Sequence, residues 1–236
     1  MLKEIINKYY LDKQRERGKS AQTRFYISQA GKCSRSIFFK FKNVPEKDLE
    51  PNILRLFDHG DHIHRLIMKA LFGAQKVRVV ASEVDMPPQE IISGRADAIL
   101  SVDNELYVLD IKSINSMLFE KLDAPKEDNV NQIQLYLHFF KIPKGILLYV
   151  SKDTQDLKEF ILNYDRNLCL NLLKDLQELK RKIDSDIIPF PLPDYPENWQ
   201  CRYCQFREVC DLIGKKEMSW PEFKKQIETE TAENEI

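Results

Sequence analysis

The sequence predicts a mixed α/β protein built around one central sheet, and three observations support this. Residues 52–72 have the spacing of apolar side chains that an amphipathic helix requires. Residues 77–111 hold three runs rich in β-branched and apolar side chains. The helical period returns at 128–141 and at 165–183. Strands bracketed by helices in this order are typical of a sheet with helices packed against it.

The individual elements follow from local signals. Amphipathic helices are expected at the N-terminus and directly after Cys33, while Pro87-Pro88 and Asp103-Asn104 separate the strands. The expected helices cover 2–17, 34–41, 52–72, 128–141 and 165–183, and the expected strands cover 77–86, 90–102, 105–111, 144–150 and 157–164. The proline-rich segment 187–199 is expected to be an extended linker.

The 236 residues suffice for one large domain or for a domain with a small lobe. We expect an N-terminal helical part at 1–50, a core at 51–190, a cysteine-rich segment at 191–225 and a disordered acidic tail at 226–236. No apolar run approaches the roughly 20 residues of a membrane span, and the N-terminus lacks the features of a secretory signal. We therefore expect a cytoplasmic protein with no membrane partner.

Charge is uninformative for the chain as a whole but not for its first part. The net charge is −1, whereas Lys and Arg are concentrated in residues 3–43. A basic region of this kind can meet the phosphates of a nucleic acid. It can equally be a solvated helix face, and composition alone leaves both interpretations open.

The segment GRADAILSVDNELYVLDIKS carries two acidic side chains on neighbouring expected strands. If Asp103-Asn104 forms a two-residue hairpin loop, Asp97 lies directly opposite Asp110, and Lys112 shares the face of Asp110. Two facing carboxylates repel each other unless a divalent cation such as Mg²⁺ or Mn²⁺ binds between them. Such an ion polarises a phosphoryl oxygen, and Lys112 can orient the attacking water. The alternative is an ordinary surface ion pair.

Two helices can complete this site. His64 lies on the expected helix before the strands, and a neutral imidazole is a good ligand for Mn²⁺ and other transition metals. Gln132 and Tyr136 are four residues apart, so they share a helix face and can hydrogen-bond a DNA phosphate or the catalytic lysine. A structural histidine and a partly buried helix with two polar tips are the alternatives.

The cysteines form a second candidate site. The segment CRYCQFREVC places Cys201, Cys204 and Cys210 within ten residues. In a reducing cytosol such clustering favours a metal or redox site over disulfides. Cys33 is the candidate fourth ligand, because Cys169 lies in a leucine-rich helix and has the character of a core residue. Four thiolates suit an iron–sulfur cluster or Zn²⁺, and the spacing does not choose between them.

Taken in order, these elements resemble the RecB-like branch of the PD-(D/E)XK nucleases. More specifically, they look like those of the CRISPR-associated RecB-like exonucleases and their viral relatives. The matching positions are Cys33, His64 at the end of GxxxH, Asp97 in GRAD, Asp110-Ile111-Lys112, Gln132 and Tyr136 as QxxxY, and Cys201, Cys204 and Cys210. Each motif is weak by itself, but the ordered set covers nearly the whole chain and is specific. Ala96 stands where the superfamily name has Pro, and Asp110 stands where it often has Glu.

The resemblance implies a restriction-endonuclease-like core, a mixed sheet flanked by helices, with an iron–sulfur subdomain formed by the two ends of the chain. It implies a 4Fe–4S cluster on the four cysteines and a Mn²⁺ or Mg²⁺ held by His64, Asp97, Asp110 and the carbonyl of Ile111. It also implies exonuclease action on single-stranded DNA ends, often from the 5′ end. Glu83, on the preceding strand, is expected to support the ligands from behind.

This function would serve CRISPR adaptation, and so antiviral defence, or viral DNA processing, with an integrase or another DNA-processing protein as partner. Two other hypotheses are kept beside the exonuclease. One is a nuclease-fold module that binds DNA or a protein partner without physiological cleavage. The other is a structural metal domain in which the acidic residues are incidental.

Overall fold

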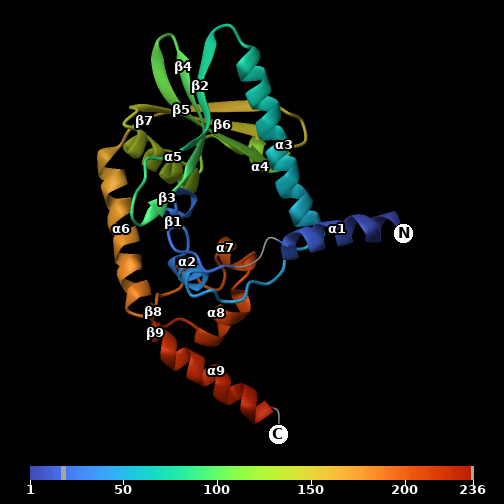
Figure 1. Ribbon diagram of the computed structural model, residues 1–236, viewed down its shortest axis with the longest axis vertical. Helices are drawn as coiled ribbons and strands as arrows, with labels where there is room; N and C mark the ends of the chain where they lie inside the picture. Colours follow the sequence, from blue (N-terminus) through green and yellow to red (C-terminus); the bar gives the residue numbers. More distant parts are fainter. Residues whose placement is uncertain (17–19, 235–236) are drawn as a thin grey trace. The chain divides into compact units, whose positions relative to one another are not determined.

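The computed structural model describes residues 1–16 and 20–234, with side chains as far as residue 227. The chain forms two compact units (Figure 1). Unit 1 comprises Met1–Gly18, Arg24–Gly31 and Glu50–Leu172, and unit 2 comprises Lys19–Thr23, Lys32–Leu49 and Leu173–Ile236. This division differs from the predicted segments, because the N-terminal helix groups with the sheet and the end of the long helix at 166–184 groups with the cysteines.

Unit 1 is organised around a five-stranded sheet in the order β2-β4-β5-β6-β7. Strands β5 and β6 are parallel, and every other neighbouring pair is antiparallel, so the predicted mixed central sheet is confirmed. The strands are β2 (Val77–Asp85), β4 (Arg95–Val102), β5 (Glu105–Ile114), β6 (Lys144–Ser151) and β7 (Leu157–Asn163).

The hairpin between β4 and β5 sets the register of the two acidic strands. Asp103 and Asn104 have φ angles of 49° and 66°, as a two-residue primed turn requires. Val102 therefore pairs with Glu105, and the ladder continues to Ala98 opposite Leu109. The predicted register is confirmed over these pairs.

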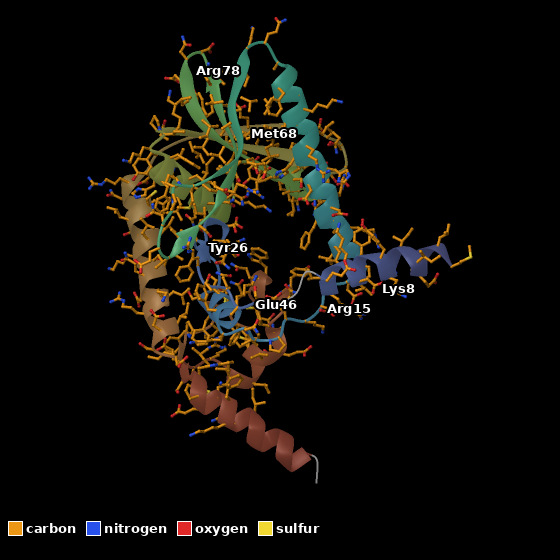
Figure 2. The ribbon with its side chains drawn as sticks, viewed as in Figure 1. Lys8, Arg15, Tyr26, Glu46, Met68 and Arg78 are labelled. Atoms are coloured by element: carbon orange, nitrogen blue, oxygen red, sulfur yellow. The ribbon has the colours of Figure 1, made fainter. Side chains whose placement is uncertain are left out.

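Helix α3 (Pro51–Gly73) covers one face of the sheet (Figure 1). Its buried Ile63 joins a core cluster with Leu109 and Ile111 of β5, and Met68 packs against the same cluster (Figure 2). The predicted helix at 52–72 is thus present, and its apolar stripe is the surface that holds it on the sheet.

Helix α5 (Glu127–Phe140) covers the opposite face, preceded by the short helix α4 (Ser116–Glu120). Ile133 of α5 packs against Leu147 and Tyr149 of β6. A Cβ atom on Gly145 would lie 2.7 Å from Ile133 Cδ1, so the glycine allows the helix to approach the strand closely.

The remaining elements of unit 1 lie around this core. Helix α1 (Leu2–Glu16) contacts α3, where Tyr10 donates a hydrogen bond to Asp58 over 3.1 Å. Strand β1 (Phe25–Tyr26) leads into a 3₁₀ turn, η1 (Ile27–Gln29), and pairs with β3 (Ile92–Ser93). The single strand predicted at 90–102 is therefore wrong: it is divided at Gly94, where a Cβ would lie 3.0 Å from Ile27.

Helix α6 (Arg166–Asp184) leads from the sheet into unit 2. Unit 2 contains α2 (Ser34–Phe41), β8 (Ile187–Ile188), α7 (Trp199–Arg202), α8 (Arg207–Ile213), β9 (Met218–Ser219) and α9 (Trp220–Asn234). Aromatic contacts hold unit 2 together. The ring centroids of Phe38 and Trp220 lie 6.0 Å apart, and those of Phe39 and Phe206 lie 5.4 Å apart.

Two expectations for this region differ from the structure. The segment 187–199 contributes the short strand β8, which pairs with β9, rather than serving only as a linker. The tail at 226–236 was expected to be disordered, whereas α9 is described as helical to Asn234, and residues 235–236 lie outside the described chain. None of the described helices combines the length and the apolar character that a membrane span needs.

Candidate functional site

Asp97 and Asp110 come together where β4 and β5 leave their shared ladder. The last described pair of that ladder is Ala98 with Leu109, one step before the two acids. Asp97 Oδ2 instead accepts a hydrogen bond of 2.6 Å from the backbone N–H of Ile111. This contact brings Asp97 to the Asp110-Ile111 backbone, and the predicted direct opposition of Asp97 and Asp110 stays a prediction, because the described ladder ends one pair before it.

Asp110 is the buried centre of the group. Asp110 is only 3% exposed, and its Oδ2 lies 2.8 Å from Lys112 Nζ. The ammonium is therefore an immediate counter-charge for the buried carboxylate. Burial raises the pKa of Asp110 to about 6; the Lys112 ammonium opposes this rise, and the charge of Asp97 adds to it.

Gln132 connects the acid and the lysine from α5. Its Oε1 accepts a hydrogen bond of 2.9 Å from Lys112 Nζ, and its Nε2 donates one of 3.3 Å to Asp110 Oδ1. Tyr136, one turn later, is buried, and its hydroxyl donates to the backbone carbonyl of Arg95 over 2.6 Å. Gln132 thus contacts the Asp110 and Lys112 side chains, and Tyr136 contacts the strand that carries Asp97.

His64 reaches the same group from α3. Its Nδ1 lies 3.5 Å from Asp97 Oδ1. Burial alone would lower the pKa of His64, but contact with Asp97 and the charge of that carboxylate raise it by more, so the pKa lies above its ordinary value. His62 points elsewhere, with its Nδ1 at 2.8 Å from the carbonyl of Asp58. The helix therefore presents one of its neighbouring histidines to the acids.

These residues form a set of donors that suits a hard cation. Carboxylate oxygens, a backbone carbonyl and one imidazole are the ligands expected around Mn²⁺ or Mg²⁺. Among the described residues, however, no three His, Cys, Asp or Glu side chains are gathered closely enough to hold a metal ion as they stand. The ligand roles of His64, Asp97, Asp110 and Ile111 consequently stay predictions.

Arg95 is a residue of this region that the sequence analysis did not single out. Its side chain is 60% exposed, and Nε lies 3.0 Å from Glu83 Oε2. Glu83 is 63% exposed and adopts a φ of 50° within β2. Glu83 therefore holds Arg95 at the surface and does not buttress the acids from behind, as was expected. The signal for Arg95 was its place in GRAD, two residues before Asp97 and so on the same side of the strand.

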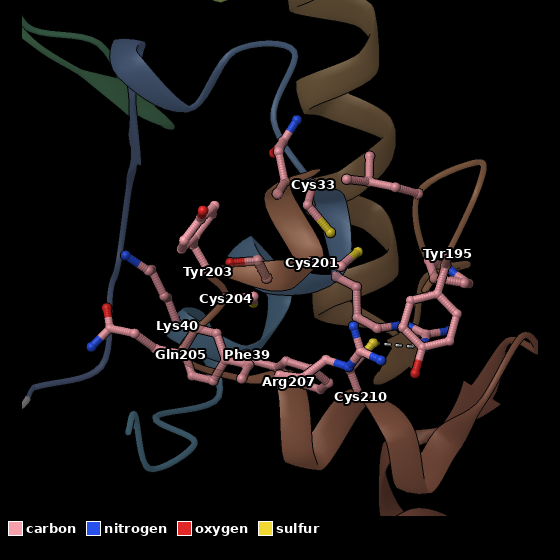
Figure 3. Close-up of a pocket in the computed structure, with 16 residues that line it drawn as sticks. Cys33, Phe39, Lys40, Tyr195, Cys201, Tyr203, Cys204, Gln205, Arg207 and Cys210 are labelled. Atoms are coloured by element: carbon pink, nitrogen blue, oxygen red, sulfur yellow. Dashed lines mark hydrogen bonds between the residues drawn. The ribbon is translucent and has the colours of Figure 1, made fainter. Parts of the chain in front are cut away.

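The cysteines lie together in unit 2. A cavity of about 180 Å³ is lined by Cys33, Cys201, Cys204 and Cys210, all of them free thiols (Figure 3). Burial raises the pKa of Cys33, Cys201 and Cys204, and the neighbouring cysteines raise it further for each. Cys169 lies outside this group; it is buried in α6, where its thiol contacts the carbonyl of Gln134. The sequence thus identified the four cysteines that share one cavity.

Comparison with known proteins agrees with the fold. Residues 40–211 match the profile of the PD-(D/E)XK nuclease superfamily. The chain is 27% identical over 217 residues to the CRISPR-associated exonuclease Cas4 of Saccharolobus solfataricus, covering 89% of this chain and 98% of that protein.

Solved structures share the fold at lower identity. The crystal structure of SSO0001 has a TM-score of 0.54 at 23% identity, over 89% of this chain and 96% of the other. LHK-Exo in complex with dAMP has a TM-score of 0.52 at 13% identity, over 69% of this chain and 90% of the other. Because the superfamily profile spans well over half of the sequence, from α2 to α8 and across every strand of the sheet, the chain belongs to the PD-(D/E)XK nuclease superfamily.

Proposed function

We propose that this chain is a metal-dependent DNA exonuclease that hydrolyses phosphodiester bonds at single-stranded ends, with 5′ to 3′ digestion as the expected polarity. The observation that carries the proposal is the pairing of the buried Asp110 with a second carboxylate, Asp97, beside the single ammonium of Lys112. Neighbouring carboxylates repel each other, and a divalent cation bound by both relieves that repulsion. Asp97 and His64 stand beside Asp110 on two other elements.

The donor set fits a single divalent cation. His64, Asp97, Asp110 and the carbonyl of Ile111 would hold Mn²⁺ or Mg²⁺ after modest side-chain rotation. When bound, such an ion supplies a Lewis acid for the phosphoryl oxygen and lowers the pKa of water. Asp110 then has a counter-charge besides Lys112, which relieves the repulsion between the two carboxylates.

Lys112 is proposed to orient the attacking water and to stabilise negative charge that develops on the phosphate. Its ammonium is held on two sides, by Asp110 Oδ2 and by Gln132 Oε1. Because Gln132 also bonds Asp110, the amide fixes the distance between lysine and acid. A preorganised donor of this kind stabilises the transition state without having to reorganise during the reaction.

DNA as substrate is supported by charge at the exposed side of the acids. Arg95 presents a guanidinium there, and its contact with Glu83 leaves the side chain more than half exposed. A planar guanidinium can donate two parallel hydrogen bonds to the oxygens of one phosphate, and a DNA strand that enters the site would present such phosphates. We propose Arg95 as a contact to the phosphate backbone.

We further propose that Cys33, Cys201, Cys204 and Cys210 hold a 4Fe–4S cluster, with Zn²⁺ as the alternative. The four thiols line one cavity, yet no three of them converge as ligands of one ion. A tetrahedral zinc site needs four sulfur atoms about 2.3 Å from a single centre. Each iron atom of a 4Fe–4S cluster takes one thiolate, so four thiols fit either group in number, and the resemblance to iron–sulfur RecB-like exonucleases is what favours the cluster.

The biological setting is proposed from the relative. Cas4 of Saccharolobus solfataricus is a CRISPR-associated exonuclease. We therefore propose that this chain trims DNA ends in CRISPR adaptation in the cytoplasm, with an integrase as its protein partner. Viral DNA processing is the alternative setting, and it would use the same chemistry on the same ends.

End-labelled DNA decides between cleavage and binding alone. Single- and double-stranded substrates labelled at either end are incubated with the wild-type protein and Mn²⁺, Mg²⁺, Ca²⁺ or chelator. We expect Mn²⁺- or Mg²⁺-dependent shortening of single strands from the 5′ end. Asp110→Ala and Lys112→Ala should abolish it while remaining folded, and Lys144→Ala, which loses contacts with Glu105 and with the Tyr107 ring, should stay active.

The other hypotheses give different outcomes in the same assay. DNA binding without cleavage under any metal would identify a binding module. Undetectable binding at low salt would favour a structural metal domain in which the acids are incidental. Full activity of Asp110→Ala or Lys112→Ala would show that the reaction takes place elsewhere.

A further inference from the structure

Arg35, the second residue of α2, is a fully buried cation beside the cysteine cavity. Its exposure is 0%. Its Nε donates a hydrogen bond to the carbonyl of Pro189 over 2.8 Å, its Nη1 donates one to the carbonyl of Gly214 over 2.8 Å, and its Nη2 donates one to the carbonyl of Lys216 over 2.7 Å. Nη1 also donates to Cys210 Sγ over 3.3 Å. The guanidinium is thus surrounded by three neutral carbonyls and one of the four clustered thiols.

Arg35 has no carboxylate partner among the described residues. A guanidinium stays protonated in proteins, so burial cannot neutralise it as it would a lysine. A buried charge is tolerated only when a counter-charge and hydrogen bonds replace the lost water. The carbonyls supply the hydrogen bonds, but they do not supply a negative charge.

Arg207 shows the usual solution in the same cavity. It also lines the cysteine pocket, and its Nε lies 2.9 and 2.7 Å from the two oxygens of Asp211. Its side chain is also 34% exposed, so water solvates part of its charge. Of the two arginines at this cavity, only Arg35 is both buried and without an acid.

We propose that the four-cysteine centre is itself the counter-charge of Arg35, and that Arg35 sets how tightly that centre is retained and, where the centre is an iron–sulfur cluster, how easily it is reduced. This rests on the proposed cysteine centre. Four thiolates carry more negative charge than a zinc ion or an oxidised 4Fe–4S core carries positive charge, so the loaded centre is an anion. Cys210 Sγ is the sulfur through which Arg35 reaches it.

The consequence follows from the sign of the charges. A fixed cation that donates a hydrogen bond to a ligand sulfur stabilises the centre when it gains an electron, so it raises the reduction potential. It also offsets the net negative charge of the loaded centre, which helps to retain the bound metal. Arg35 is therefore a positioning and tuning residue, and it is not a metal ligand.

A purely structural role would look different. The hydrogen bonds from Arg35 to three backbone carbonyls connect α2 to the segments around β8 and β9. In a purely structural role, Arg35 would do no more than hold these segments of unit 2 together. Arg35→Lys keeps the charge but cannot reproduce the fork of donors, whereas Arg35→Met keeps the bulk and removes the charge. The pair of variants separates charge from clamping.

The test uses full-length wild type, Arg35→Met, Arg35→Lys and Arg207→Met, purified without oxygen. Iron, zinc and acid-labile sulfide are measured per chain, with the visible spectrum, the rate of metal loss to a chelator, and the midpoint of a redox titration. We expect Arg35→Met to lose metal about 10–100-fold faster and its reduction potential to become more negative. Arg35→Lys and Arg207→Met should stay close to the wild type.

Each other outcome has a definite meaning. Equal metal loss in Arg35→Met and Arg35→Lys would overturn the proposal in favour of a structural clamp, and wild-type behaviour of Arg35→Met would overturn any role. If Arg35→Met does not fold, Arg35→Lys decides: retention like the wild type supports the counter-charge, and rapid loss overturns it. A wild-type protein that carries neither iron nor zinc would instead refute the cysteine centre on which the proposal rests.

Discussion

The Lys112 ammonium donates a hydrogen bond to the amide oxygen of Gln132 over 2.9 Å. The same amide donates from its nitrogen to Asp110, so both ends of one side chain are used and its orientation is fixed. Lysine and acid come from β5, and the amide comes from α5 on the face that packs against that strand. The relationship turns a mobile lysine into a group with a defined position.

Gln132→Ala should therefore impair catalysis more than folding. The lysine loses the amide that holds it in position, so its charge is no longer preorganised for the transition state. We expect kcat on single-stranded DNA to fall about 10–100-fold, and the midpoint of urea unfolding to fall by less than in a variant that loses only stability. The measurement is initial rates at saturating Mn²⁺.

Gln134→Ala is the matched control on the same helix. Gln134 is buried and bonds the carbonyl of Asn163 and the N–H of Asp165, both over 2.7 Å, away from the acids. Its loss should lower the unfolding midpoint and leave kcat of the folded protein near that of the wild type. The reverse pattern, with Gln132→Ala affecting only stability, would contradict the proposed role.

Gln132 and Tyr136 show how much of the candidate site around Asp110 and Lys112 could be predicted from the sequence. Their spacing predicts one helix face, and Gln132 does contact the catalytic lysine as expected. Tyr136 contacts the carbonyl of Arg95 instead, because its partner depends on where α5 crosses the sheet. The turn at Asp103-Asn104 predicted the register correctly, since a two-residue loop leaves no freedom. Where the ladder ends could not be predicted, because it depends on neighbouring elements.

Tyr136→Phe should affect stability rather than DNA binding. The hydroxyl is buried and its hydrogen bond to Arg95 joins α5 to β4, so removing it should lower the free energy of unfolding by about 1 kcal/mol. KM for DNA should not change. Urea unfolding and steady-state kinetics measure the two quantities.

Tyr107→Phe, which loses an exposed hydrogen bond to Glu105, is the control and should leave both the stability and KM unchanged. A raised KM at unchanged stability would show that the Tyr136 hydroxyl binds DNA after all.

His64→Ala should weaken the binding of Mn²⁺ more than the binding of Mg²⁺. An imidazole nitrogen favours transition ions, whereas Mg²⁺ prefers oxygen ligands and water. We expect the Mn²⁺ concentration for half-maximal cleavage to rise at least about tenfold, with a smaller rise for Mg²⁺. His62→Ala removes a neighbouring histidine whose Nδ1 hydrogen-bonds with the carbonyl of Asp58, so its metal response should match the wild type. Equal metal responses in the two variants would remove His64 from the ligand set.

The cysteine cavity shows the complementary limit of sequence analysis. The spacing of Cys201, Cys204 and Cys210 predicts a cluster, and Cys33 is selected because Cys169 belongs to a helical apolar pattern. Nothing in that pattern indicates Arg35, since an arginine early in a helix is usually solvated. Its burial depends on the segments around β8 and β9 folding over α2, and these short elements have almost no sequence signal.

Gly60 is expected to set the distance between α3 and the catalytic strand. It lies one turn before His64 on the same helix face, and a Cβ there would be 3.3 Å from Ser113 Oγ, directly after Lys112. Alanine favours a helix over glycine by about 0.5–1 kcal/mol, so Gly60→Ala gains helix propensity while crowding β5. The helix must shift by a few tenths of an ångström or Ser113 must rotate.

We therefore expect Gly60→Ala to reduce Mn²⁺-dependent kcat about tenfold, because His64 is displaced from Asp97, without lowering the unfolding midpoint. Gly60→Ala with Ser113→Ala removes the crowding atom and should recover most of the rate. Gly73→Ala, at the end of the same helix with no atom near its added Cβ, should keep the wild-type rate. A double variant as slow as Gly60→Ala would mean that Gly60 acts through something other than its approach to Ser113.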